Sequence, residues 1–255
     1  MDFWVLVFLG LIQGITEFLP ISSSGHLVLA EHFFGISCDL VFLNVLLHCA
    51  TLLAVIIYYR KTLLYLITHP LCRLNKYLVV ATIPAVIFVL LFNSFVETTF
   101  SNLVFVGVGF ILSAVFLTIA VICANKNTNP QPLNYKNVTI MGLSQALAIF
   151  PGLSRSGTTL SFGLAAGTER QTALDFSFLM SIPIILASLI YQIFTSDFSS
   201  AFVGLDTVGI IISTISAFFS ALLGLILMKK IVKKINLIYF VPYLIVIGIL
   251  TIIFA

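Results

Sequence analysis

Charged residues are scarce in this sequence. Asp, Glu, Lys and Arg together make up 8% of its 255 residues, whereas apolar residues make up 60%. Soluble domains carry about 25% charged residues, so this chain has too few charges to cover a water-facing surface of its size. A soluble globular domain is therefore excluded, and the apolar residues must face lipid as well as one another.

The sequence also lacks a cleavable signal peptide and any metal-binding spacing of cysteines. No basic residue precedes the first apolar run and no small-residue cleavage site follows it, so we expect the mature protein to keep its N-terminus. The cysteines show no CxxC or zinc pattern. We expect all four to be free and structural: Cys38, Cys49, Cys72 and Cys123.

Long apolar runs, in contrast, are plentiful. Several reach roughly 20 residues, the length needed to cross a hydrocarbon core of about 30 Å. The sequence predicts six spanning helices, over residues 39–59, 77–95, 102–124, 172–195, 206–228 and 235–255. Lys and Arg gather in alternate connections, at residues 60–76, 126–136 and 229–234. The positive-inside rule places these connections in the cytoplasm and both termini outside.

Two further segments, residues 1–30 and 138–168, do not fit as spans. Each begins apolar and then breaks into a stretch rich in Gly, Pro and Ser, at residues 17–26 and 151–159. Non-helical backbone at membrane depth is tolerated only where protein or a water-filled cavity covers it. We therefore predict two re-entrant hairpins, in each of which a helix enters, a polar loop turns, and a second helix returns.

The two segments resemble each other at a fixed offset of 132 residues. The identical pairs are Gly10 and Gly142, Leu11 and Leu143, Gln13 and Gln145, Phe18 and Phe150, Ser22 and Ser154, Ser24 and Ser156, and Gly25 and Gly157. Three spans follow each hairpin, and because three is odd, the second repeat must lie upside down relative to the first.

The predicted fold is therefore an all-α integral membrane protein with six spans in total. We expect a single membrane domain over residues 1–255, built from two inverted-topology repeats at approximately 1–124 and 133–255. Inverted repeats with interrupted helices place their binding site near the midplane. The polar stretches 17–26 and 151–159 should therefore face each other.

Both polar stretches carry groups suited to phosphate. Arg155 offers a planar fork of donors to phosphate oxygens, and a helix beginning near Gly157 would add its N-terminal N–H groups. Two opposed turns of this kind suit a diphosphate. The candidate substrate-binding residues are Gln13, Ser22, Ser24, Gly25, Gly152, Ser154, Ser156, Gly157 and Thr159.

Glu17 and His26 supply acid–base capacity. Ser23 lies three residues before His26, close enough for contact across a helix turn, and a serine activated by a neighbouring base is a common covalent route. Gln13 and Glu17, at i and i+4 on one helix face, could hold a hard divalent cation whose shell the substrate phosphates complete. The candidate catalytic residues are Glu17, Ser23, His26 and Arg155, and the candidate metal ligands are Glu17 and Gln13.

Structural interpretations stay open beside these functional ones. Small residues in membrane helices often serve only close packing, and Arg155 by itself could be a helix cap. We assign no role to His32, His48 or His69, and expect His48, in an apolar run, to be a satisfied core residue. The polar group of Glu169, Arg170 and Asp175 is interpreted as mainly structural.

These motifs resemble those of the undecaprenyl-diphosphate phosphatases of the bacitracin-resistance type. That family carries an (E/Q)xxxE motif, a Ser-rich turn ending in Gly-His, and a PGxSRSxxT motif. All three occur here in order, at residues 13–17, 22–26 and 151–159, and the resemblance covers nearly the whole chain. It implies removal of the terminal phosphate of undecaprenyl diphosphate in the bacterial cytoplasmic membrane, which yields the monophosphate carrier used in cell-wall synthesis.

The resemblance also implies residue roles and a cofactor, a divalent cation, either Mg or Ca. Glu17 would serve metal binding or acid–base chemistry, and Arg155 would bind the diphosphate. Ser23 would be the nucleophile or a phosphate ligand, and His26 would activate it. Gln13 stands where many members have Glu, which leaves only one carboxylate for a metal.

The expected partners are a polyprenyl diphosphate substrate and membrane lipids. We expect no nucleic-acid partner, and the sequence leaves a homodimer open. The alternative function is a transporter or flippase of polyprenyl phosphate lipids, because inverted repeats with broken helices are typical of secondary transporters. A transporter needs the phosphate site but no reacting pair of Ser23 and His26. A channel is a third interpretation, and the charge-poor spans argue against it.

Overall fold

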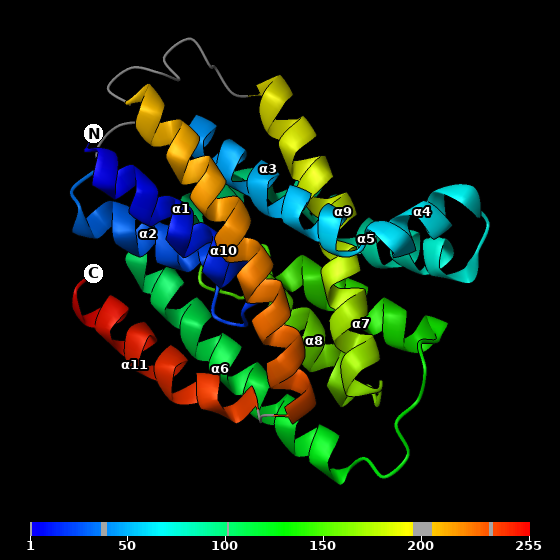
Figure 1. Ribbon diagram of the computed structural model, residues 1–255. Helices are drawn as coiled ribbons and strands as arrows, with labels where there is room; N and C mark the ends of the chain where they lie inside the picture. Colours follow the sequence, from blue (N-terminus) through cyan, green and yellow to red (C-terminus); the bar gives the residue numbers. More distant parts are fainter. Residues whose placement is uncertain (1, 37–39, 101, 196–205, 235–236) are drawn as a thin grey trace.

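The computed structural model describes residues 2–36, 40–100, 102–195, 206–234 and 237–255, and these residues are almost entirely helical (Figure 1). The helices are α1 Phe3–Phe18, α2 Ser23–Phe33, α3 Val41–Tyr58, α4 Arg60–Thr68, α5 Arg73–Phe100, α6 Leu103–Lys126, α7 Tyr135–Leu147, α8 Arg155–Ala165, α9 Arg170–Thr195, α10 Thr207–Lys234 and α11 Phe240–Ile253. A short 3₁₀ turn, Leu237–Tyr239, precedes α11.

Five of these helices are long and apolar enough to cross a membrane. They are α3, α5, α6, α9 and α10, and each overlaps one of the predicted spans. The sixth predicted span, residues 235–255, contains the shorter apolar helix α11 of 14 residues. The chain is therefore a multi-pass helical membrane protein.

The basic connection predicted as a loop after α3 contains a further helix, α4. This helix ends at Thr68, because Pro70 disfavours helical backbone in the residue before it. His69 accordingly has φ −126° and ψ 67°. Cys49, Cys72 and Cys123 are free, as predicted, and Cys38 lies outside the described residues.

Two helical hairpins stand apart from the long helices. In the first, α1 and α2 flank a turn at residues 19–22, and in the second, α7 and α8 flank a turn at residues 148–154. The 16 residues of α1 span about 24 Å, and the other three helices are shorter. None of the four crosses a hydrocarbon core of about 30 Å, as expected of re-entrant hairpins.

Each hairpin packs its first helix on a long helix from the other half of the chain. The first helix α1 lies along α10, and α7 lies along α5 (Figure 1). Glycine permits both approaches: a Cβ at Gly10 would lie 2.2 Å from the carbonyl oxygen of Ser213, and one at Gly142 would lie 2.7 Å from the Cα of Ala81. Small residues at such contacts are typical of membrane helices. Gly10 and Gly142 are also partners at the 132-residue offset.

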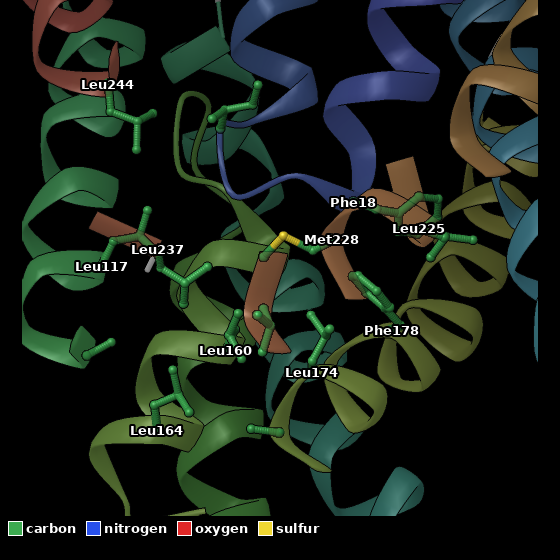
Figure 2. Packing of buried hydrophobic residues seen from close by; sticks show 14 of the residues in the cluster. Phe18, Leu117, Leu160, Leu164, Leu174, Phe178, Leu225, Met228, Leu237 and Leu244 are labelled. Atoms are coloured by element: carbon green, nitrogen blue, oxygen red, sulfur yellow. The ribbon is translucent and has the colours of Figure 1, made fainter. Parts of the chain in front are cut away.

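An apolar core joins the hairpins to the long helices (Figure 2). Its labelled side chains come from α1 (Phe18), α6 (Leu117), α8 (Leu160, Leu164), α9 (Leu174, Phe178), α10 (Leu225, Met228), the 3₁₀ turn (Leu237) and α11 (Leu244). The rings of Phe18 and Phe178 meet edge to face, with centroids 5.4 Å apart. Because Phe18 is the last residue of α1, this contact fixes the point at which the first polar turn begins.

Candidate active site at the junction of the two hairpins

The two polar turns meet, as the sequence predicted. We define residues 17–26 and 151–159 together as the hairpin junction. The hydroxyls of Ser154 and Ser156 both donate to the carbonyl oxygen of Leu19, at 3.4 and 2.9 Å. The glycines pack across the junction as well, since a Cβ at Gly25 would lie 3.0 Å from the Cα of Gly152. The junction is therefore held by polar contacts from both halves of the chain.

Both returning helices begin with the same cap. The Ser22 hydroxyl accepts from the Gly25 N–H at 3.2 Å, and the Ser154 hydroxyl accepts from the Gly157 N–H at 3.1 Å. Serine is a strongly favoured N-cap because its oxygen satisfies an N–H group that the helix leaves free. The two caps are 132 residues apart.

The residue after each cap is chemically different. Ser23 is the first residue of α2, and Arg155 is the first residue of α8. Both side chains turn to the same acceptor, Glu17, near the end of α1. The near-symmetric hairpins therefore bring an asymmetric pair, a hydroxyl and a guanidinium, onto one carboxylate.

Glu17 is the centre of a compact polar cluster. Arg155 Nη2 donates to its Oε1 at 2.5 Å, Ser23 Oγ donates to Oε2 at 2.6 Å, and Gln13 Nε2 donates to Oε2 at 2.9 Å. The Glu17 side chain is 5% exposed and that of Arg155 is 16% exposed. Charges so far from water are expensive and tend to be retained for function.

Two buried polar atoms of the cluster have no hydrogen-bond partner: Arg155 Nη1 and Gln13 Oε1. Leaving a buried donor or acceptor unpaired costs about 1–3 kcal/mol. The Gln13 amide is oriented by the carboxylate beside it, which accepts from Nε2 and so directs Oε1 away. The cluster thus contains one unpaired cationic donor and one unpaired oxygen acceptor.

The expected contact between Ser23 and His26 is not found, so that part of the prediction was wrong. His26 Nδ1 lies 2.7 Å from the carbonyl oxygen of Ser22, and Nε2 lies 2.5 Å from the hydroxyl of Tyr243 on α11. The imidazole also stacks on the Tyr243 ring. Both ring nitrogens are engaged elsewhere, and the base next to Ser23 is Glu17.

His48 was missed by the sequence interpretation, which treated it as a core residue. Its Nε2 lies 4.0 Å from Glu17 Oε2, and its Nδ1 donates to the carbonyl oxygen of Asn44 at 2.7 Å. The side chain is 32% exposed. A signal was present in the sequence, since any ionisable residue within a span is a candidate functional group.

The remaining candidate residues mainly build the junction. The Thr159 hydroxyl pairs with that of Ser177 at 2.6 Å, and Gly152 adopts a positive φ of 79° at the second turn. The hydroxyls of Ser22 and Ser24 lie 3.3 Å apart, as do those of Ser154 and Ser156. A substrate-binding role for this group stays a prediction.

A divalent cation requires several oxygen, nitrogen or sulfur ligands that converge on one point. Among the described residues there is no cluster of three or more His, Cys, Asp or Glu side chains. Glu17 and the unpaired Gln13 Oε1 still offer two oxygen ligands on adjacent turns of α1. Mg²⁺ is commonly held by one or two protein oxygens together with substrate phosphates, and these residues fit that arrangement.

The acidic and basic residues around α9 have structural partners, as interpreted from the sequence. Asp175 accepts from the Tyr59 hydroxyl at 2.6 Å and pairs with Lys229 at 2.9 Å. Tyr59 is buried, and its hydroxyl donates this bond to the carboxylate. Arg170 donates to Asn125 at 2.7 Å.

Comparison with known proteins gives a consistent picture. The sequence profile described as "Bacitracin resistance protein BacA" matches residues 6–250. The chain is 41% identical over 248 residues to undecaprenyl-diphosphatase 3 of Bacillus cereus. That alignment covers 97% of this chain and 95% of the Bacillus cereus protein. It is 42% identical over 252 residues to undecaprenyl-diphosphatase of Thermosipho melanesiensis, covering 95% and 96%. It is 37% identical over 262 residues to undecaprenyl-diphosphatase 1 of Shouchella clausii, covering 97% and 95%.

Proposed function

This chain belongs to the bacitracin resistance protein BacA family, and we propose that the cluster around Glu17 is the site at which it dephosphorylates undecaprenyl diphosphate. Similarity over nearly the full length to proteins named undecaprenyl-diphosphatase supports that activity. The enzyme converts the diphosphate to the monophosphate lipid carrier with release of phosphate, which serves cell-wall synthesis and bacitracin resistance. The observation that carries the site assignment is the bond between Ser23 and Glu17, beside the Arg155 ion pair.

Arg155 binds the phosphate. Its Nη2 is held by Glu17, while Nη1 is buried without a partner and is free to donate to a phosphate oxygen. Guanidinium–phosphate bonds are charge-assisted and roughly twice as strong as neutral ones. The same group then faces the negative charge on the phosphoryl oxygens during transfer. Stabilising that charge, together with positioning the reacting groups, provides nearly all of the catalysis in phosphoryl-transfer enzymes.

Ser23 is the nucleophile and Glu17 its base. The Ser23 oxygen attacks the terminal phosphorus, and its proton passes along the 2.6 Å bond to Glu17 Oε2. The bond between the terminal phosphorus and the bridging oxygen breaks, and the lipid monophosphate leaves with that electron pair. Water then attacks the phosphorus of the phosphoserine, and the bond between phosphorus and the Ser23 oxygen breaks. Ser23 regains the proton held by Glu17, one proton of the water stays on the phosphate that leaves, and the other proton of the water is released from the site.

His48 connects Glu17 with water. Because Nδ1 donates to the Asn44 carbonyl, Nε2 presents its lone pair toward Glu17 Oε2, 4.0 Å away. At this distance a proton passes between the two side chains only if they move closer or a water bridges them, and the partly exposed imidazole can then exchange it with solvent. His26 instead positions Tyr243, and so ties α2 to α11.

A divalent cation, Mg or Ca, fits beside this machinery. Gln13 Oε1 and Glu17 would hold it together with the diphosphate oxygens. When bound, such a cation neutralises phosphate charge and aligns the leaving group. Gln13 then has two tasks, since its Nε2 also orients the Glu17 carboxylate.

We also propose that the two halves of the chain, at about 1–124 and 133–255, are inverted repeats. The swapped pairing of α1 with α10 and α7 with α5 supports it, as do the equivalent caps at Ser22 and Ser154. Six spans then place both termini on the outer face of the bacterial cytoplasmic membrane, with the basic connections inside. A homodimer stays a prediction.

Phosphate release from undecaprenyl diphosphate by the purified protein tests the site assignment. General-base catalysis contributes about 10²–10⁴-fold, so E17Q and S23A should each lose activity on that scale. T16V is the matched control, because Thr16 is the buried neighbour of Glu17 and, among the described residues, its hydroxyl bonds only to the Ile12 carbonyl. Near-normal turnover in both E17Q and S23A would show that the chemistry lies elsewhere. Lipid translocation without phosphate release would favour the transporter alternative.

A further inference from the structure

A strongly basic cleft lies apart from the hairpin junction. It has a volume of about 860 Å³ and forms where the ends of α6 and α10 meet the start of α9. These ends lie together at the bottom of the view in Figure 1. Ligand sites typically measure about 300–1,000 Å³. The lining residues are Ala124, Asn127, Pro130, Thr168, Glu169, Arg170, Gln171, Lys229, Lys230, Val232 and Lys233.

The positive charge of this cleft is only partly compensated. Four cations line it against a single carboxylate, Glu169. Asp175 neutralises Lys229, but among the described residues neither Lys230 nor Lys233 has an ion-pair partner. Like charges three residues apart on a helix repel each other. Lys230 and Lys233 are therefore held together without a protein anion between them.

The wall of the cleft is preformed. Residues 127–131 are joined to the turn before α9 by backbone bonds from Gln131 N to Gly167 O at 2.9 Å and from Glu169 N to Gln131 O at 3.1 Å. The Asn127 side chain also donates to the Gly167 carbonyl, at 3.2 Å. This wall is therefore held in place by hydrogen bonds before any ligand binds.

The position of the cleft, at the end of an apolar span, indicates which kind of anion it would bind. The apolar span of α10 ends at Lys233, and we expect lipid phosphates to lie near the ends of such spans. Exposed apolar side chains lie next to the cleft on two of its helices, Ile122 on α6 and Leu227 on α10. Basic pockets between membrane helices bind lipid headgroups. We propose that this cleft is a second phosphate site, which holds the phosphate monoester headgroup of a membrane lipid.

Binding of fluorescent phosphatidic acid to the purified protein in detergent micelles tests this site. The variant K230Q/K233Q removes two charges and keeps both aliphatic stems, and we expect its affinity to fall about 30-fold, or about 1 kcal/mol per cation. K126Q is the matched control, since Lys126 is an exposed cation at the end of α6 that does not line the cleft. It should bind as the wild type does.

The outcomes separate this site from the catalytic one. Hydrolysis of undecaprenyl diphosphate by K230Q/K233Q should stay at the wild-type rate, and K230R/K233R should keep phosphatidic acid binding. Equal losses in K126Q and K230Q/K233Q, or weak binding by K230R/K233R, would overturn the proposal. Displacement of phosphatidic acid by inorganic phosphate or pyrophosphate at comparable concentration would assign the cleft to a soluble anion. No preference over phosphatidylcholine would refute a phosphate site.

Discussion

Replacing Arg155 with lysine tests how the guanidinium is shared between protein and substrate. In the structure Nη2 is bound to Glu17 while Nη1 stays free. A lysine ammonium is a point charge on a flexible stem and lacks the rigid fork needed to serve both directions at once. R155K should therefore keep either the ion pair with Glu17 or the contact with the substrate phosphate, but not both. The net charge of the site does not change in this variant.

The size of the effect follows from that single lost bond. A hydrogen bond to a charged group is worth about 1.5–3 kcal/mol, so kcat/KM of R155K should fall about 10- to 150-fold. R155M should lose more activity and also stability. This variant leaves the Glu17 carboxylate, which is 5% exposed, buried without its cationic partner. Breaking such a buried pair lowers the free energy of unfolding by about 3–5 kcal/mol.

Steady-state phosphate release and thermal unfolding in detergent measure the two effects separately. R155K should unfold near the wild-type temperature and R155M well below it. The double variant E17Q/R155M should recover part of that loss, because it removes the stranded carboxylate. Wild-type kinetics in R155K would refute the divided role of the guanidinium, and equal unfolding temperatures for R155M and the wild type would refute the cost assigned to the buried pair.

Four further changes follow from the same contacts. H48Q should lower kcat by about 10-fold with little change in KM, measured by phosphate release, because it removes the imidazole that exchanges protons between Glu17 and water. Q13E adds a carboxylate to the metal ligands and should lower the Mg²⁺ concentration for half-maximal activity, measured by titration after chelation. Y243F removes the hydroxyl bound to His26 and should lower the unfolding temperature slightly, whereas unchanged melting would show that this bond contributes nothing. G10V should unfold at a much lower temperature than the wild type, because its Cβ would lie 2.2 Å from a carbonyl oxygen of α10.

Much of the fold could be predicted because lipid imposes simple requirements. A chain with 8% charged residues must be embedded, and run length alone located the five long helices. The polar turns were visible because Ser, Gly and Pro interrupt apolar helices at residues 17–26 and 151–159. The helix α4 was missed, since it is short, begins with the cationic pair Arg60–Lys61 and is followed closely by Pro70, features that are also typical of a loop.

The candidate site could be predicted only in part. Glu17 and Arg155 were found because a buried charge is costly wherever it occurs in a membrane segment. The pairing of Ser23 with His26 was wrong, because proximity along a helix does not decide which way an imidazole turns. His26 faces the carbonyl of Ser22 and the hydroxyl of Tyr243, and no local signal links residue 26 to residue 243.

The sequence by itself determined that this protein is embedded in lipid, where its helices break, and which residue types lie at the breaks. Those features depend on composition and on local spacing, which need no folded neighbour. Only the tertiary structure decided that Ser23 meets Glu17, that His48 lies beside them, and that Lys230 and Lys233 line a basic cleft. Each of these contacts joins segments through helix packing, and hydrogen-bond geometry over a few ångströms then selects one partner among several of the same chemical type.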